Sequence, residues 1–182
     1  MRVIGIVGLP ASGKGEFSRV AREMGIPVVV MGDVIRRKAA EEGIPEDDTR
    51  LGGIGNRLRE EHGMDAIARF TIPAVEATGA PLVVIDGIRG DAEVQAFRQR
   101  FPEFVLVGIV ASFEARLARL AARGRADDTG QRAALTLRDA RERGWGLSRA
   151  LQQAEHVIKN GGTMAEFEEK VRALLSRLGA CP

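Results

Sequence analysis

A short apolar run leads directly into a glycine-rich loop at the start of the chain. Residues 3–7 read VIGIV, and residues 8–15 read GLPASGKG. A continuous apolar run of this length is typical of a strand buried on both faces of a sheet. Residues 14–23 then show a helical pattern that ends near Gly25. A strand, a glycine loop and a helix in this order predict one unit of a parallel α/β sheet.

The glycine-rich loop carries most of a phosphate-binding pattern. Of G-x-x-x-x-G-K-[ST], the chain matches the first seven positions and then continues with Gly15. Glycines let backbone N–H groups face phosphate oxygens, and the N-terminus of the following helix adds positive partial charge. An ordinary strand-to-helix turn that happens to contain a lysine is a less favoured interpretation. A dinucleotide-binding loop is also disfavoured, because its glycines have the spacing G-x-G-x-x-G. We expect the loop to bind the phosphates of ATP, with Lys14 also catalytic, through Gly8, Leu9, Pro10, Ala11, Ser12, Gly13, Lys14, Gly15 and Glu16.

Length, composition and charge limit the class of protein. The chain has 182 residues, which suits one domain, and no apolar run approaches the roughly 20 residues of a membrane-spanning helix. The single cysteine, Cys181, has no partner for an intramolecular disulfide, so we expect a cytoplasmic protein. A net charge of +2 does not favour nucleic acid as a partner, and it leaves that class open. No pattern in the chain specifies an oligomeric state.

Four further apolar segments alternate with helical patterns. They cover residues 27–31, 82–85, 104–110 and 156–158. Five short apolar strands separated by helices predict a parallel sheet with right-handed crossovers, and hence a three-layer α/β/α fold. Two polar helical inserts interrupt the alternation, and such inserts often cover a substrate. We expect a single domain over residues 1–182, with an acceptor-binding insert at about 33–78 and a lid insert at about 124–154.

Asp86 follows directly after the apolar segment 82–85. An acid at the carboxyl end of a strand beside a phosphate loop can hold Mg²⁺ or its water shell. An isolated aspartate at this place would be an ordinary turn residue. Beside this loop, we interpret Asp86 as the metal-side residue, with ATP and Mg²⁺ as the cofactors.

The segment MGDVIR, residues 31–36, places an acid and a base on one helical face. Asp33 is expected to cap a helix, and Arg36 lies three residues further on, at the distance that brings side chains together. An arginine in the first turn opposes the helix dipole, and a nearby bound phosphate would offset that cost. A plain N-cap is the alternative reading of Asp33.

These segments together resemble the adenylate kinase group of nucleoside monophosphate kinases. GLPASGKG, GDVIR and DGIR occur in the order and context found in that group. The resemblance implies that Arg36 and Arg89 bind the phosphate of an acceptor nucleotide. We expect Asp33, which shares a helical face with Arg36, to be a substrate-binding residue as well. The resemblance also implies that Asp86 lies on the metal side, and that G-K-G is an ordinary form of the phosphate loop. The chain departs from the group at Glu16, where Thr is usual.

A narrower resemblance extends over nearly the whole chain. The segments MGDVIR, VIDGIR, RDARERGWG and HVIKNGGTMAEFEEKV look like an archaeal family of P-loop kinases. That family is related to adenylate, cytidylate and dephospho-CoA kinases. The resemblance implies the fold and the use of ATP, and it leaves the acceptor open. We therefore expect a five-stranded sheet in the order 2-3-1-4-5.

Arginines are frequent in and beside the expected lid. In related kinases, lid arginines neutralise the transferring phosphoryl group, which in some enzymes of this chemistry raises the rate by roughly 10³–10⁵. The resemblance therefore suggests catalytic roles for Arg123, Arg125, Arg138 and Arg141, with a new helical stretch beginning near residue 138. The alternative is a solvated helix face with acidic surface partners.

The loop after the last expected strand reads IKNGG, residues 158–162. In kinases of this shape that loop runs beside the adenine, so Asn160 and Gly161 are candidates for nucleotide binding. The composition also fits an ordinary strand-to-helix turn, which would explain both residues without a ligand.

The combined reading is an ATP-dependent phosphotransferase acting on a small phosphorylated or nucleoside-like acceptor. The paired Arg36 and Arg89 favour a nucleoside monophosphate. One alternative is a dephospho-CoA kinase, which phosphorylates a hydroxyl group and could use Asp33 as the base. Another is an adenylate-kinase-like ATPase that assists the assembly of RNA or protein.

Overall fold

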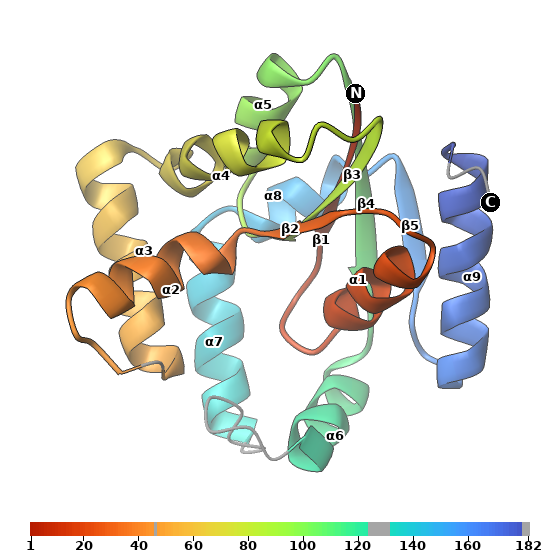
Figure 1. Ribbon diagram of the computed structural model, residues 1–182. Coiled ribbons are helices and arrows are strands. Elements are labelled where there is room, and N and C mark those ends of the chain that lie inside the picture. Colours follow the sequence, from red (N-terminus) through yellow and green to blue (C-terminus); the bar gives the residue numbers. More distant parts are fainter. Residues whose placement is uncertain (46, 124–131, 180–182) are drawn as a thin grey trace.

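The structure is a computed structural model that describes residues 1–45, 47–123 and 132–179. The described chain forms a single sheet with helices around it (Figure 1). The strands are β1 (Arg2–Val7), β2 (Val28–Val30), β3 (Leu82–Ile88), β4 (Glu103–Val110) and β5 (His156–Lys159). The helices are α1 (Lys14–Glu23), α2 (Gly32–Glu41), α3 (Asp48–His62), α4 (Ala66–Ala77), α5 (Asp91–Arg100), α6 (Phe113–Arg123), α7 (Arg132–Gly144), α8 (Leu147–Gln152) and α9 (Met164–Arg177).

The sheet has the predicted topology. All strand pairs are parallel, and the strand order is β2-β3-β1-β4-β5. β1 therefore lies in the centre, between β3 and β4. Because parallel strands end at the same edge, the loops after β1 and β3 emerge side by side. Ile6 of β1 is opposite Asp86 of β3, which places Asp86 beside the start of the glycine loop.

Both faces of the sheet are buried, which explains the unbroken apolar runs in the sequence. Successive side chains of a strand point to opposite faces, and here they enter two separate clusters. Val3 and Val7 pack on the face covered by α4, α5 and α8, whereas Ile4 and Ile6 pack against α1 and α9. The result is the expected three-layer α/β/α arrangement (Figure 1).

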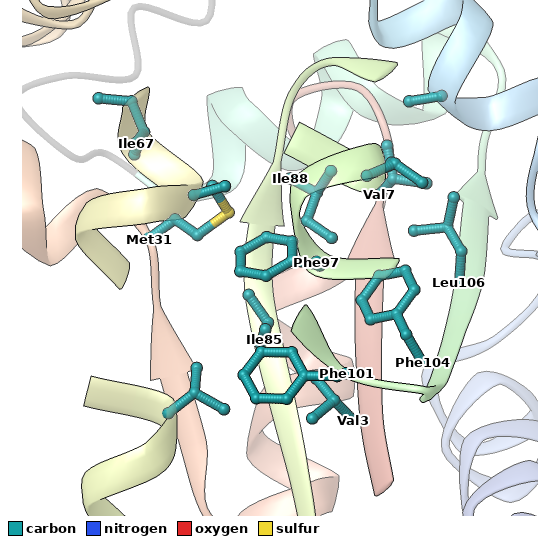
Figure 2. Close-up of a cluster of buried hydrophobic side chains, with 14 of the residues drawn as sticks. Val3, Val7, Met31, Ile67, Ile85, Ile88, Phe97, Phe101, Phe104 and Leu106 are labelled. Atoms are coloured by element: carbon teal, nitrogen blue, oxygen red, sulfur yellow. The ribbon is translucent and has the colours of Figure 1, made fainter. Parts of the chain in front are cut away.

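Stacked aromatic rings form the centre of the first cluster (Figure 2). The ring of Phe97 on α5 lies 5.8 Å from that of Phe104 and 6.5 Å from that of Phe101, measured between centroids. Ile85 and Ile88 of β3 pack on the same cluster. This packing holds β3 and the segment that follows it against α5.

Two local predictions were wrong. The N-cap of α2 is Met31, and Asp33 is a first-turn residue that makes no cap hydrogen bond. The chain turns into α2 directly after β2, because the backbone N–H of Met31 bonds to the carbonyl of Asp86 at 2.8 Å. The helix expected from residue 138 begins earlier, at Arg132.

Each of the two expected inserts contributes one helix to the hydrophobic core. α4 packs against α5, and α8 packs against β1 and α5, so both helices belong to the core. α2, α3 and α7 lie beyond the end of the sheet, on the side of the glycine loop (Figure 1). None of the described helices is long and apolar enough to cross a membrane.

The stacked cluster gives a test of the fold. Phe97 is fully buried, so Phe97→Ala should lower the free energy of unfolding by about 3–5 kcal/mol through lost burial and a cavity. Leu137→Ala, at a side chain that is 72% exposed, should change it by less than about 0.5 kcal/mol. Chemical denaturation monitored by circular dichroism measures both values. Equal effects of the two changes would contradict the packing described here.

Candidate functional site

The glycine loop closes tightly between β1 and α1. A Cβ atom at Gly8 would come within 2.4 Å of the carbonyl oxygen of Ile109, which is a backbone atom that cannot give way. Gly13 has φ +121°, and a Cβ there would lie 2.4 Å from the amide nitrogen of Asn160. Ala11 adopts a left-handed conformation with φ 58°. The loop therefore needs glycine at Gly8 and Gly13, and its curled backbone is the one that the phosphate-binding pattern predicts.

Lys14 folds back over this loop. Its ammonium group donates hydrogen bonds to the carbonyls of Gly8, at 2.5 Å, and Leu9, at 3.0 Å. The N-cap of α1 is Gly13, which has no side chain to offer the first-turn N–H groups. An anion at the loop would meet these N–H groups, the helix dipole and Lys14 together.

Burial changes the protonation of Lys14. Removal from water, together with the positive charge of Arg89, lowers its pKa from 10.5 to about 7, although Glu142 and Asp86 act in the opposite direction. At neutral pH the amine is therefore close to half-protonated. A polyphosphate beside it would favour the charged form.

Asp86 accepts a hydrogen bond from the buried hydroxyl of Ser18, at 2.7 Å between Oγ and Oδ2. Sequence reasoning did not single out Ser18. Its position four residues after Lys14, on the same face of α1, was the available signal. The described residues contain no group of three or more His, Cys, Asp or Glu side chains suited to hold a metal alone. One carboxylate and a hydroxyl beside a phosphate loop do suit Mg²⁺, which keeps several waters and binds substrate phosphates.

Glu16 turns away from the loop. Its carboxylate accepts a hydrogen bond of 2.6 Å from Nε of Arg19, one turn further along α1. Arg19 also pairs with Glu23 on α1 and with Glu168 on α9. Glu16 thus takes part in a surface network that joins two helices. Its predicted contact with ATP stays a prediction.

Asn160 is hydrogen-bonded to the glycine loop. Its side-chain amide donates to the carbonyl of Ser12 at 2.9 Å, and its Oδ1 accepts from Arg119 at 3.0 Å. Arg119 also donates to the carbonyls of Ala11 and Ser12, both at 3.3 Å. The structure therefore places Asn160 against the loop itself, whereas Gly161 is exposed. Nucleotide binding by either residue stays a prediction.

A buried ion pair connects the loop with α7. Arg116 of α6 makes two hydrogen bonds to Asp139 of α7, at 2.8 and 2.6 Å, and a third to the carbonyl of Pro10 at 3.2 Å. Arg116 is 2% exposed and Asp139 is 2% exposed. Neither was predicted as a site residue, because the pair joins positions 23 residues apart across two helices.

A cavity of about 130 Å³ lies between α2, α3, the end of β3 and α7. Charged residues of its lining act electrostatically on Lys14 of the glycine loop. Four arginines that the sequence analysis proposed line it together: Arg36 and Arg89 as acceptor residues, and Arg138 and Arg141 as lid residues. The full lining is Met31, Gly32, Ile35, Arg36, Leu51, Gly52, Arg59, Ile67, Gly87, Arg89, Arg138, Arg141, Glu142 and Trp145. The tertiary structure thus gathers distant arginines into one basic cavity.

Glu142 of α7 is the acidic member of this lining, and sequence reasoning missed it. It forms an ion pair with Arg89 and lies 3.5 Å from Nε of Arg138. Burial disfavours its charge, but Arg89, Lys14 and Arg138 outweigh that effect and lower its pKa below the ordinary value. Glu142 is therefore a buried and ionised carboxylate within reach of the charge on Lys14.

A second buried pair fixes the segment that carries Arg89. Glu93 accepts a hydrogen bond of 2.6 Å from Arg59, and its other oxygen accepts from the backbone N–H of Arg89 at 2.7 Å. The guanidinium of Arg59 lies 4.2 Å from the ring centre of Trp145, whose Nε1 donates to Asn56 at 2.7 Å. Trp145 is thus a packing residue at the wall of the cavity.

Asp33 is not part of this cavity lining. Asp33 is 58% exposed and pairs with Arg36, at 2.5 Å. Arg123 is the last residue of α6, and its side chain is outside what the structure describes. Arg125 lies outside the described residues.

The pKa of Lys14 leads to a test by calorimetry. With a pKa of about 7, Lys14 is mostly neutral at pH 8, and bound phosphates should restore its charge. Binding of ATP at pH 8 should therefore take up nearly one proton. Titration calorimetry in two buffers of different ionisation enthalpy measures that number. The Lys14→Arg variant keeps its charge, so it should take up almost none. The same uptake in both proteins would contradict this assignment.

The chain is similar to known archaeal proteins. A family model described as an AAA domain matches residues 7–138. A UPF0200 protein of Methanoculleus marisnigri is 58% identical over 179 residues, which cover 98% of both chains. A UPF0200 protein of Methanoregula boonei is 56% identical over 175 residues, which cover 96% of both chains.

Solved structures share the fold. TT1252 from Thermus thermophilus has a TM-score of 0.65 at 21% identity, covering 97% of each chain. A gluconokinase from Sinorhizobium meliloti has a TM-score of 0.57 at 19% identity, covering 97% of this chain and 93% of its own. A shikimate kinase from Aquifex aeolicus has a TM-score of 0.53 at 16% identity, covering 96% of each chain. These findings confirm the resemblance seen in the sequence: the chain belongs to the UPF0200 family and has the fold of P-loop kinases, which implies nucleotide binding.

Proposed function

We propose that the protein is a phosphotransferase that moves the γ-phosphoryl group of ATP to a small anionic, nucleotide-like acceptor. One observation carries the proposal: a basic cavity lies close to the glycine loop, since the charges of Arg89, Arg138 and Glu142 in its lining act on Lys14. The loop supplies the donor site and the cavity supplies a separate acceptor site. A kinase needs these two sites next to each other.

The donor site would use the loop and the first turn of α1. Their N–H groups would bind the ATP phosphates, and Lys14 would leave the carbonyls of Gly8 and Leu9 to contact the phosphates. Asp86, with Ser18 behind it, would hold Mg²⁺ through its water shell. When bound, this ion would neutralise charge on the phosphates.

The acceptor site is strongly basic. Arginines from α2, α3, α7 and the loop after β3 line it, and Glu142 is the carboxylate among the described residues that line it. Arg36 and Arg89 support a phosphate-bearing acceptor, and a nucleoside monophosphate is the first candidate. The cavity of about 130 Å³ is smaller than the roughly 300 Å³ of typical ligand pockets, so acceptor binding would require α7 to move outward.

Catalysis would rest on alignment and on neutralisation of charge. Lys14 and the arginines surround the point where the loop meets the cavity. No covalent intermediate with the protein is needed, because phosphoryl transfer gains most of its rate from positioning and electrostatics. The cavity walls would exclude water from the transferring group. The printed names of the structural neighbours, gluconokinase and shikimate kinase, agree with phosphorylation of small molecules.

Lys14 provides the first test of this proposal. Lys14→Ala should lower ATP turnover by at least about 100-fold, because a charge that neutralises the transferring phosphoryl group is lost. Lys170→Ala, at an exposed residue of α9, is the matched control and should keep normal turnover. Release of labelled phosphate or transfer from γ-labelled ATP measures both. Near-normal turnover of Lys14→Ala with an intact circular dichroism spectrum would refute the enzymatic proposal.

Arg36 provides a test of the acceptor site. Transfer from labelled ATP should be screened over nucleosides, nucleoside monophosphates and dephospho-CoA. For the acceptor so found, Arg36→Ala should raise KM about 10- to 100-fold, with the Kd for ATP unchanged, because one charged hydrogen-bonding partner is lost. An equal loss of ATP affinity would place Arg36 on the donor side instead. Hydrolysis stimulated only by RNA or a protein partner, with no small phosphorylated product, would favour an assembly ATPase.

A further inference from the structure

The position of Glu142 bears on the chemistry of the acceptor. This residue belongs to α7, is 2% exposed and lines the cavity close to the glycine loop. Glu142 lies within ion-pair distance of Arg89 and Arg138, and it interacts electrostatically with Lys14. An ionised carboxylate thus contacts residues that would hold the acceptor and lies within electrostatic range of the lysine that would hold the donor phosphates.

A carboxylate at this point suits one kind of acceptor and opposes another. A phosphate acceptor at neutral pH has an ionised oxygen ready to attack, so it has no proton to lose, and the charge of that attacking oxygen would be repelled by Glu142. A hydroxyl acceptor must lose a proton as it attacks. In protein kinases a carboxylate receives that proton. The buried Glu142 therefore favours a hydroxyl oxygen as the attacking atom, in place of the phosphate oxygen of a nucleoside monophosphate.

The other nearby carboxylates do not suit this role. Asp33, the base considered from the sequence, is 58% exposed and pairs with Arg36 outside the cavity lining. Asp86 is bonded to Ser18 on the metal side. Glu93 does not line the cavity, and its oxygens accept hydrogen bonds from Arg59 and from backbone N–H groups. Among the described residues that line the cavity, Glu142 is the one carboxylate.

We propose that Glu142 is the catalytic base of this enzyme and that the acceptor carries a hydroxyl group together with an anionic group. This inference rests on the proposed kinase function. The acceptor O–H bond breaks and its proton passes to a carboxylate oxygen of Glu142. The acceptor oxygen forms a bond to the γ-phosphorus of ATP, and the bond from that phosphorus to the β,γ-bridging oxygen breaks. The products are a phosphate monoester and ADP. The arginines of the cavity hold the anionic group of the acceptor.

Water is a hydroxyl acceptor that every preparation contains, so slow hydrolysis of ATP can report on the base. Glu142→Gln should lower the kcat of hydrolysis by about 100-fold or more, the usual contribution of a general base. Its KM and its Kd for ATP should stay within about threefold, which a purely structural role would not predict. The Kd can be followed by fluorescence of Trp145, the single tryptophan. Glu142→Asp keeps the carboxylate and should recover part of the rate, whereas Glu169→Gln, at an exposed residue of α9, should behave as the wild type.

The outcomes separate this inference from the proposed function. Hydrolysis at the wild-type rate or faster in Glu142→Gln, with Lys14→Ala inactive, would overturn the role of Glu142 and leave the kinase proposal intact. Absence of any turnover by the wild type would overturn both. Phosphorus NMR of the product from the acceptor screen tests the inference independently, because it identifies the new linkage. A phosphate monoester supports the inference, and a new diphosphate linkage on a nucleoside monophosphate overturns it.

Discussion

Burial of β1 on both faces is the constraint on which the rest of the site depends. β1 lies at the centre of the sheet, and its side chains pack alternately into the two hydrophobic clusters. Its carboxyl end therefore cannot shift without disturbing both layers. The glycine loop begins at this end, and the register with β3 sets the distance from the loop to Asp86. The position of the loop thus follows from the packing of the core.

Arginines then tie the loop to the helices around it. Arg116 connects the carbonyl of Pro10 to Asp139 on α7, and Arg119 connects the carbonyls of Ala11 and Ser12 to Asn160. These bonds to loop carbonyls fix the backbone of the loop in its curled conformation. A movement of α7 would shift Asp139 and could displace Arg116, which is hydrogen-bonded to the loop carbonyl of Pro10. Arg116 therefore links the glycine loop to the helix that lines the cavity.

The charges of the site are balanced within the protein. Lys14 is buried near Arg89 and Arg138, and Glu142 and Asp86 partly compensate these cations. Removing charged groups from water is costly unless each has a partner, so such a cluster is stable only with mixed signs. Anionic ligands would change this balance, so we expect ligand binding to change the protonation of Lys14. The positive charges of Arg89, Lys14 and Arg138 keep the buried carboxylate of Glu142 ionised.

The sequence by itself determined the fold and the donor loop, because both depend on local patterns. The apolar runs specified the strands of the parallel sheet, and the glycines with Lys14 specified the loop. Their order along the chain, with the resemblance of the motifs, also indicated the strand order. Only the tertiary structure decided which side chains meet Arg89, since Glu93 and Glu142 reach it from α5 and α7. Such pairs depend on how helices pack in space, and periodicity within one segment contains no information about a partner in another.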